Sequence, residues 1–133
     1  MRSGFGSCSA AQRELCRGHS VGLITTHVLD TARGVPAAGV PVRLEHFGRD
    51  GWTQIGVSST DDDGRVRKIG PEIGPGTYRL IFDTAAYAAQ QAGDSDPVFF
   101  PEVTVTFAVH DRARNYHVPL LLSPYGFSTY RGS

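Results

Sequence analysis

Residues 116–133, with the sequence YHVPLLLSPYGFSTYRGS, are the most informative part of the chain. Apolar side chains occupy every second position at the start of this stretch: Tyr116, Val118, Leu120 and Leu122. Because successive side chains of a strand point to opposite faces, we predict a strand over 116–122 with one face in a hydrophobic core. His117 lies on the opposite face. The Ser-Pro-Tyr-Gly run at 123–126 predicts a turn.

The rest of the chain indicates the same fold class. Sixteen glycines and eight prolines separate short runs of alternating polarity, which is typical of a sandwich or barrel of antiparallel strands. We predict further strands over 21–29, 41–47, 52–58, 76–82 and 103–109. One helix is predicted over 84–91, where four alanines and two glutamines occur, with Asp83 or Thr84 as its N-cap and its end at Gly93. The sequence therefore predicts an all-β sandwich with one short helix.

Composition limits the domain organisation and the class of partner. A chain of 133 residues, 40% of them hydrophobic, suffices for one domain, which we place at 21–133. The net charge of zero argues against nucleic acid as a partner, and no apolar run approaches the roughly 20 residues that span a membrane. Residues 1–20 are predicted to be a disordered or weakly ordered extension without the apolar centre of a secretion signal. Cys8 and Cys16 lie in it, and we expect unpaired thiols in a reducing cytoplasm.

Two histidines are predicted on one kind of surface. If the inner faces of strands 21–29 and 116–122 pack into the core, His27 and His117 both lie on the outer face of a sheet. Leucines lie on that outer face as well: Leu23, Leu29 and Leu121. An outer face that carries leucine beside histidine predicts burial against another subunit.

Further polar residues complete the candidate site. The run TDDDGR at 60–65 predicts a turn that ends in Arg65; its carboxylates lack the spacing of a calcium loop. The closing residues Tyr130, Arg131, Gly132 and Ser133 offer an aromatic ring, a fixed cation, a close backbone approach and a hydroxyl. These groups suit an anionic, planar heterocycle.

Two motifs resemble a known family. Residues 27–42, HVLDTARGVPAAGVPV, resemble the N-terminal signature of the transthyretin family, and residues 116–128 resemble its C-terminal signature. Within that family, His27, Arg65, His117 and the Tyr-Arg-Gly-Ser ending are similar to the 5-hydroxyisourate hydrolases rather than to the hormone carriers.

The resemblance implies a fold, an assembly and an activity. The fold would be a transthyretin-like (prealbumin-like) Greek-key β-sandwich of seven to eight strands with one short helix. The assembly would be a homotetramer, a dimer of dimers around a central channel. The reaction would be metal-independent and cofactor-free hydrolysis of an oxidised purine, 5-hydroxyisourate, to 2-oxo-4-hydroxy-4-carboxy-5-ureidoimidazoline in urate catabolism. His27, Arg65 and His117 would be catalytic, and residues 130–133 would bind the substrate.

The residue types fit that chemistry. Attack of water on a ring carbonyl needs a base for the water and a cation or donor for the developing oxyanion. Histidine accepts protons near neutral pH, and we favour His117 slightly over His27 as the base. Arg65 keeps its proton and so suits charge stabilisation.

Three other hypotheses stay open at this point. The same channel carries a hydrophobic hormone in transthyretin itself, so a small-molecule carrier is one alternative. Residues 39–42, 60–65 and 75–78 are similar to carboxypeptidase regulatory-like and collagen-adhesin B-type sandwich domains, which are structural spacers. The histidines could also gather around catalytic zinc, although their positions show no close ligand spacing: His19, His27, His46, His110 and His117.

Overall fold

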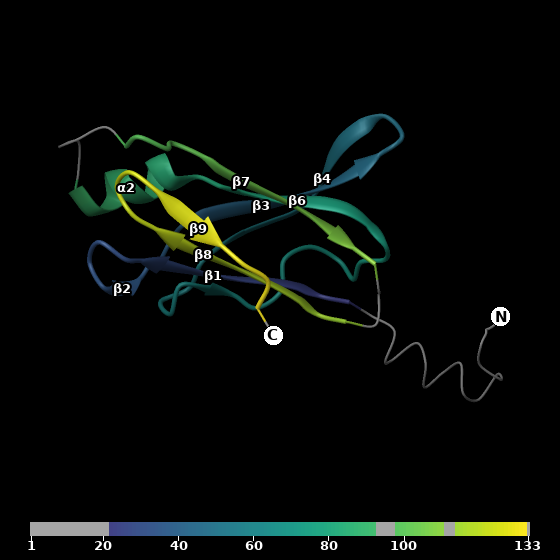
Figure 1. The fold of residues 1–133 in the computed structure, drawn as a ribbon, viewed down its shortest axis with the longest axis horizontal. Helices are drawn as coiled ribbons and strands as arrows, with labels where there is room; N and C mark the ends of the chain where they lie inside the picture. The colour runs from purple at the N-terminus through teal and green to yellow at the C-terminus, as the bar shows by residue number, and fades with distance from the viewer. Residues whose placement is uncertain (1–21, 93–97, 111–113, 133) are drawn as a thin grey trace.

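The computed structural model describes residues 22–92, 98–110 and 114–132. Two β-sheets lie face to face in this part of the chain, with helix α2 at one end (Figure 1). One sheet has the strand order β2-β1-β8-β9, with β5 also paired to β1, and the other has the order β4-β3-β6-β7. The predicted all-β sandwich with one short helix is thus confirmed.

The strands of the first sheet are β1 (Ile24–Asp30), β2 (Val35–Pro36), β5 (Arg65–Val66), β8 (Tyr116–Leu122) and β9 (Phe127–Thr129). The strands of the second sheet are β3 (Pro41–Gly48), β4 (Gly51–Ser59), β6 (Gly76–Phe82) and β7 (Val103–Val109). All six predicted strands are present, with ends within three residues of prediction. Strands β2, β5 and β9 were not predicted, because two or three residues are too few to show alternation.

The pairing of β1 with β8 corrects the expectation of purely antiparallel strands. These two strands run parallel, with Ile24 opposite Tyr116 and Asp30 opposite Leu122, whereas the other pairs of named strands in the described residues are antiparallel. Parallel neighbours need a long crossover, and here the chain passes through the whole second sheet between them. Alternation within a strand carries no information on the direction of its partner.

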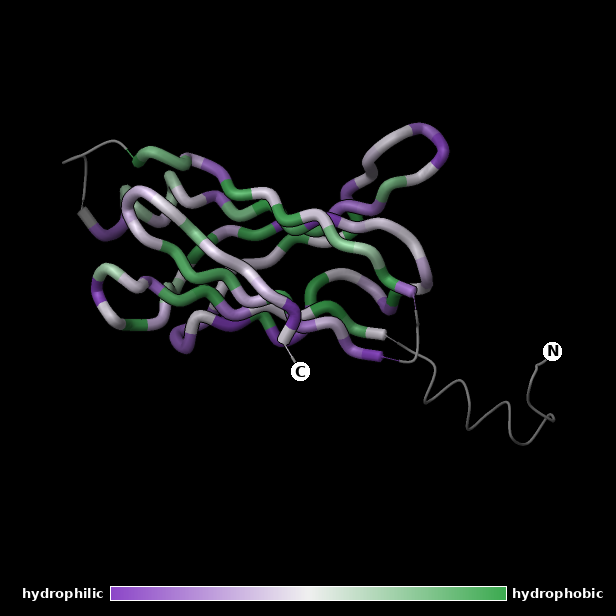
Figure 2. Tube along the Cα trace, viewed as in Figure 1, coloured by the Kyte–Doolittle hydropathy of each residue, from purple (hydrophilic) through white to green (hydrophobic). Residues whose placement is uncertain are grey.

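The core lies between the two sheets. It includes Ile24 and Val28 of β1 and Leu120 of β8, each without solvent exposure. Facing side chains come from the second sheet, among them Leu44, Leu80 and Phe82. Figure 2 shows hydrophobic segments along the strands of both layers. Burying each such side chain contributes about 1.5–3 kcal/mol, so the inner faces hold both strands in register.

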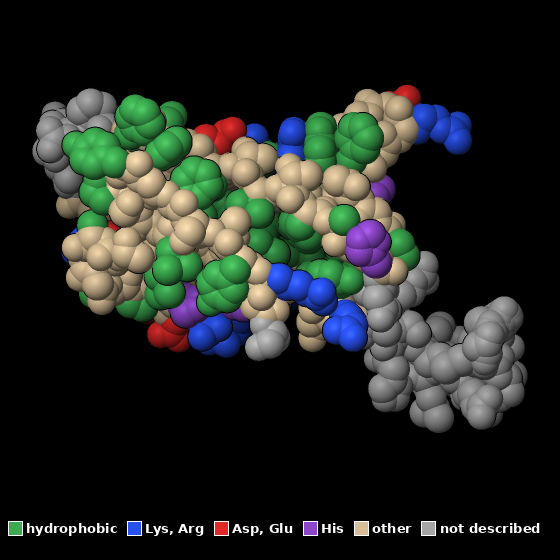
Figure 3. Space-filling view, in the orientation of Figure 1, with side chains coloured by type: hydrophobic (Ala, Val, Ile, Leu, Met, Phe, Trp, Pro, Cys, Tyr) green, Lys and Arg blue, Asp and Glu red, His purple; other side chains and the backbone are tan. Residues whose placement is uncertain are grey.

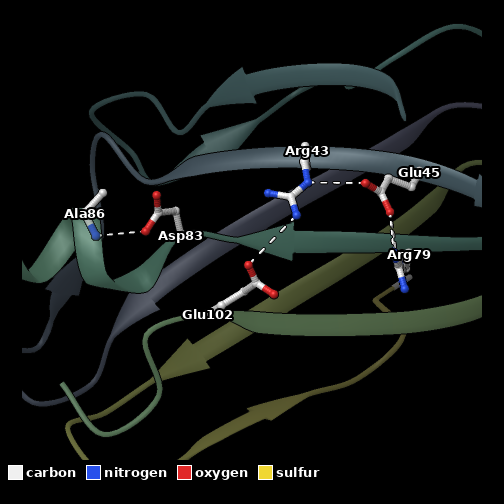
Figure 4. A network of polar contacts seen from close by, with 6 residues as sticks. All are labelled: Arg43, Glu45, Arg79, Asp83, Ala86 and Glu102. Carbon is white, nitrogen blue, oxygen red and sulfur yellow. Dashed lines mark hydrogen bonds and ion pairs between the residues drawn. The ribbon is translucent and has the colours of Figure 1, made fainter. Parts of the chain in front are cut away.

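Helix α2 (Thr84–Ala92) follows β6 directly. Of the two predicted N-caps, Asp83 is the one observed, because its Oδ1 accepts a hydrogen bond from the Ala86 amide at 3.0 Å (Figure 4). Gly93, where the helix was predicted to end, lies outside the described residues. The helix is anchored at Tyr87, whose hydroxyl donates to the buried Asp30 carboxylate at 2.7 Å.

The outer face of the second sheet carries paired charges. Glu45 accepts a hydrogen bond from Arg79 Nε at 2.7 Å and another from Arg43 Nε at 3.3 Å (Figure 4). Partial burial acts to raise the pKa of Glu45, but the hydrogen bonds from Arg79 and Arg43 hold it below its ordinary value. Arg43 also reaches Glu102 at 3.9 Å. These cations are therefore matched by carboxylates.

Candidate functional site

Strand β1 holds the site together because it has neighbours on both sides. Its parallel pairing with β8 places Thr25 opposite His117. Its antiparallel pairing with β5 places His27 opposite Arg65. Both histidines are half-buried and alternate with buried neighbours, Thr26 and Val118, in agreement with the predicted outer face. Residues that are far apart in the sequence thus meet on one surface.

Each histidine ring has a defined partner. His117 Nδ1 lies 2.7 Å from the hydroxyl oxygen of Thr25. His27 Nε2 lies 2.9 Å from the main-chain oxygen of Asp63. Since a carbonyl oxygen only accepts, His27 must carry its proton on Nε2, which leaves Nδ1 as the unprotonated nitrogen of its neutral form.

The turn before β5 sets the position of both Arg65 and the oxygen that His27 contacts. Asp61 Oδ1 accepts hydrogen bonds from the amides of Asp63 at 2.9 Å and Arg65 at 3.0 Å. These bonds, first the one from Arg65, keep the pKa of Asp61 below its ordinary value. Gly64 allows the tight turn, with a φ of 76° and a main-chain approach to Val28 that a Cβ atom would obstruct. One carboxylate therefore organises two parts of the site.

A cavity of about 180 Å³ opens where these residues meet. Its lining residues are Thr25, Thr26, Arg65, Val66, Arg67 and His117. Arg67 is exposed and lies 3.8 Å from Asp61 and 3.6 Å from Asp63 in ion pairs. Exposed pairs of this kind are weak, so the cation stays available at the rim.

Electrostatics favour a neutral ring at His117. Burial is the largest cause that lowers its pKa below the ordinary value of 6.5, and the nearby charges of Arg65 and His27 add to it. A histidine with a lowered pKa is unprotonated at neutral pH. It can then accept a proton from a bound water molecule.

The C-terminal segment meets the site through Gly132. Its amide donates to the main-chain oxygen of His117 at 2.8 Å, in an antiparallel bridge. A Cβ atom at this position would lie only 2.5 Å from His117 Cδ2. The main chain of Gly132 therefore lies close to the edge of the imidazole ring of His117.

Tyr130 and Arg131 point elsewhere. Their side chains line a second cavity of about 400 Å³, between the edge strands β7 and β9. Arg131 lies over the ring of Tyr116 with its guanidinium carbon 4.7 Å from the ring centroid. In Figure 3 basic side chains border hydrophobic surface on the face of the molecule shown there. Within one chain, then, the structure does not bring these two side chains to the cavity beside His117, and Ser133 lies outside the described residues.

The sequence pattern assigned neither Thr25 nor Asp61 to the site. The signal for Thr25 was its spacing, because a residue two positions before His27 shares the same strand face. Its contact with His117 depends on the register of β1 and β8. The carbonyl of Asp63 carried no signal, since any residue type supplies a main-chain oxygen.

The described residues show neither a metal-binding cluster nor a membrane-spanning helix. Among residues 22–92, 98–110 and 114–132, no three His, Cys, Asp or Glu side chains come together as a group that could hold a metal ion. Across the same residues, no helix is both long enough and apolar enough to span a membrane.

Known proteins resemble this chain along most of its length. The model of the HIUase/Transthyretin family matches residues 24–132. The 5-hydroxyisourate hydrolase of Salmonella dublin is 47% identical over 113 residues, which covers 84% of this chain and 81% of that protein. The solved structure of Klebsiella pneumoniae 5-hydroxyisourate hydrolase has a TM-score of 0.72 at 30% identity, over 84% of this chain and 99% of that one. Sea bream transthyretin, solved in complex with thyroxine, has a TM-score of 0.75 at 33% identity, over 82% and 93%. The chain belongs to the HIUase/Transthyretin family.

Proposed function

We propose that this chain hydrolyses 5-hydroxyisourate to 2-oxo-4-hydroxy-4-carboxy-5-ureidoimidazoline in urate catabolism. The observation that carries the proposal is the surface cavity lined by His117 and Arg65, with His27 as the direct strand partner of Arg65. The relatives named 5-hydroxyisourate hydrolase support the same substrate. A cavity lined by cations and hydroxyls suits a polar, electron-rich heterocycle better than an apolar hormone.

His117 takes the proton from the attacking water. Its pKa lies below the ordinary value, so the base form predominates at neutral pH. A positioned base of this kind contributes roughly 10²–10⁴-fold to the rate. His27 is the second proton-transfer group, held by the carbonyl of Asp63.

Arg65 stabilises the negative charge that develops on the carbonyl oxygen. A guanidinium keeps its charge at every relevant pH and offers several N–H donors in a fixed plane. Donors already in place when charge develops lower the barrier without reorganisation. No described residue group could hold a metal, and we propose that the reaction needs none; activity that survives excess EDTA would support this.

Residues 130–133 bind the substrate in a homotetramer, a dimer of dimers, in which each site takes residues from two subunits. Two observations support this part of the proposal. Tyr130 is 58% exposed and lines another cavity than His117 within one chain. Leu23, Leu29 and Leu121 share the outer face with the histidines and are only half-buried. Dilution that dissociates the tetramer should then lower the specific activity in step with the tetramer population measured by light scattering.

We also place the protein in the cytoplasm, because unpaired thiols are predicted at Cys8 and Cys16.

The experiment generates 5-hydroxyisourate in place with uricase and follows the decay of its ultraviolet absorbance. The wild-type chain should accelerate this decay, and His27→Ala, Arg65→Ala and His117→Ala should each slow turnover by about 10²-fold or more. His46→Gln on β3 and Arg49→Ala in the turn between β3 and β4 are matched controls away from the site and should stay near wild type. Near-normal turnover in all three site variants would exclude the assignment of catalytic residues.

A carrier is the second candidate, because sea bream transthyretin was solved with thyroxine bound. Calorimetric titration with thyroxine tests it directly. Tight thyroxine binding together with no acceleration of 5-hydroxyisourate decay would favour the carrier over the hydrolase.

A further inference from the structure

We propose that Thr25 is a positioning residue, which holds His117 as the tautomer protonated on Nδ1 and thereby presents Nε2 as the proton acceptor. This inference rests on the proposed function for its kinetic consequence. The contact itself is independent of any substrate: the Thr25 hydroxyl oxygen lies 2.7 Å from His117 Nδ1. At that distance the two groups share a hydrogen bond.

The contact is fixed by the fold. Thr25 and His117 are 92 positions apart in the sequence, yet they are direct partners in the parallel register of β1 and β8. On either side, buried Ile24 and Thr26 hold the strand against the core. The two outward side chains therefore have little freedom to separate.

A second constraint acts on the opposite side of the ring. The main chain of Gly132 packs against the Cδ2 edge, where an added Cβ would lie 2.5 Å away. In an imidazole, Nδ1 and Cδ2 flank Cγ on its two sides. With Thr25 on one side and Gly132 on the other, the ring presents Cε1 and Nε2 outward. Nε2 is then the nitrogen left for substrate or water.

The proton assignment follows from the function of the ring. A threonine hydroxyl accepts as well as donates, so it can take the hydrogen bond of an Nδ1–H group. A neutral ring protonated on Nδ1 has its lone pair on Nε2, where a base needs it. A ring protonated on Nε2 would direct its lone pair at the strand and could not abstract a proton at the cavity. In the Nδ1–H form the hydroxyl also stabilises the imidazolium that forms during proton transfer.

Two substitutions separate this role from plain packing. Thr25→Val keeps the shape and the β-branching of the side chain but removes the hydroxyl. Thr25→Ser keeps the hydroxyl and removes the methyl group. We expect Thr25→Val to lower kcat by up to about 10²-fold with little change in KM, whereas Thr25→Ser stays within roughly threefold of wild type. Thr53→Val, an exposed threonine on β4, is the matched control and should be neutral.

The pH dependence of kcat/KM distinguishes the proposed role of Thr25 from plain packing. Without the hydroxyl, the protonated ring of His117 loses an acceptor, so the acid limb of kcat/KM should shift to lower pH in Thr25→Val. Nitrogen-15 spectra of the His117 ring give the tautomer without any substrate. Wild type should show Nδ1–H in the neutral form, and Thr25→Val should show a mixture or Nε2–H.

The rates and the nitrogen-15 spectra test the proposed function and the role of Thr25 separately. A wild-type chain that fails to hydrolyse 5-hydroxyisourate overturns the proposed function, while the spectra still test the tautomer. Wild-type spectra showing Nε2–H overturn the inference, as does a Thr25→Val variant with an unchanged tautomer and normal kcat. If Thr25→Val does not fold, the wild-type spectra and the Thr25→Ser rates decide the matter.

Discussion

Replacing Gly132 by alanine tests the contact between the C-terminal segment and the site. The added Cβ would lie 2.5 Å from His117 Cδ2 and 3.1 Å from its Cγ. Carbon atoms in contact normally stay about 3.5–4.0 Å apart, so either the ring or the segment must move by about 1 Å. The hydrogen bond from the Gly132 amide to the main-chain oxygen of His117, now 2.8 Å long, limits how the segment can retreat.

The expected loss follows from that displacement. A misplacement of about 1 Å at a reacting group costs on the order of 10²-fold in rate. We therefore expect kcat/KM of Gly132→Ala to fall by about 10²-fold, or about 2.7 kcal/mol of transition-state stabilisation. The free energy of unfolding should change far less, because Gly132 lies at the edge of the sheet and outside the core.

The assay is the decay of 5-hydroxyisourate absorbance, with urea unfolding of the same preparations. Gly126→Ala is the matched control in the same segment, since the nearest atom to its new Cβ is Ser123 Oγ at 3.6 Å, an ordinary contact. If Gly132→Ala and Gly126→Ala both keep full activity, the approach of the segment to the ring has no catalytic consequence and this reasoning fails.

Three further predictions concern protonation, the turn and the helix anchor. Activity should fall with decreasing pH as His117 gains a proton. Because burial, Arg65 and His27 lower the pKa of His117, the midpoint of the pH profile of kcat/KM should lie below pH 6.5. A midpoint above pH 6.5 would contradict the role of this ring as base. Asp61→Ala removes the acceptor that shapes the turn before β5 and should reduce kcat/KM by roughly tenfold, while its neighbour variant Asp62→Ala stays normal; equal rates would refute the organising role. Tyr87→Phe leaves the buried carboxylate of Asp30 without its hydroxyl donor. This variant should keep its kcat but lose about 1–3 kcal/mol of the free energy of unfolding, as measured by urea unfolding.

The strands were predictable from sequence because alternation is a local property. Strands 76–82, 103–109 and 116–122 begin and end where alternation and turn residues place them. The same periodicity placed His27 and His117 on an outer face, since each is flanked by residues that the core buries. Asp83 as N-cap was likewise readable from a short polar residue before an alanine-rich run.

The assembly of the site was not predictable from alternation. The direction and register of β1 against β8 depend on packing between segments about ninety positions apart, and a strand's own sequence carries neither. Strand β5 has two residues, so Arg65 gave no periodic signal for its place beside His27. Family resemblance supplied the set of residues, and only the fold showed that Tyr130 and Arg131 line another cavity.

In this fold, the packing of the core therefore determines the geometry of the site. The inner faces of β1 and β8 bury Ile24, Val28 and Leu120 completely, and these contacts fix the register that places Thr25 beside His117. A slip of one residue in β8 would turn the imidazole into the core and its apolar neighbours into solvent. Each buried aliphatic side chain contributes about 1.5–3 kcal/mol, so such a slip is strongly disfavoured. The precision of the site thus derives from hydrophobic side chains that never contact the substrate, and a truncation such as Leu120→Ala would loosen the His117 contacts as well as the fold.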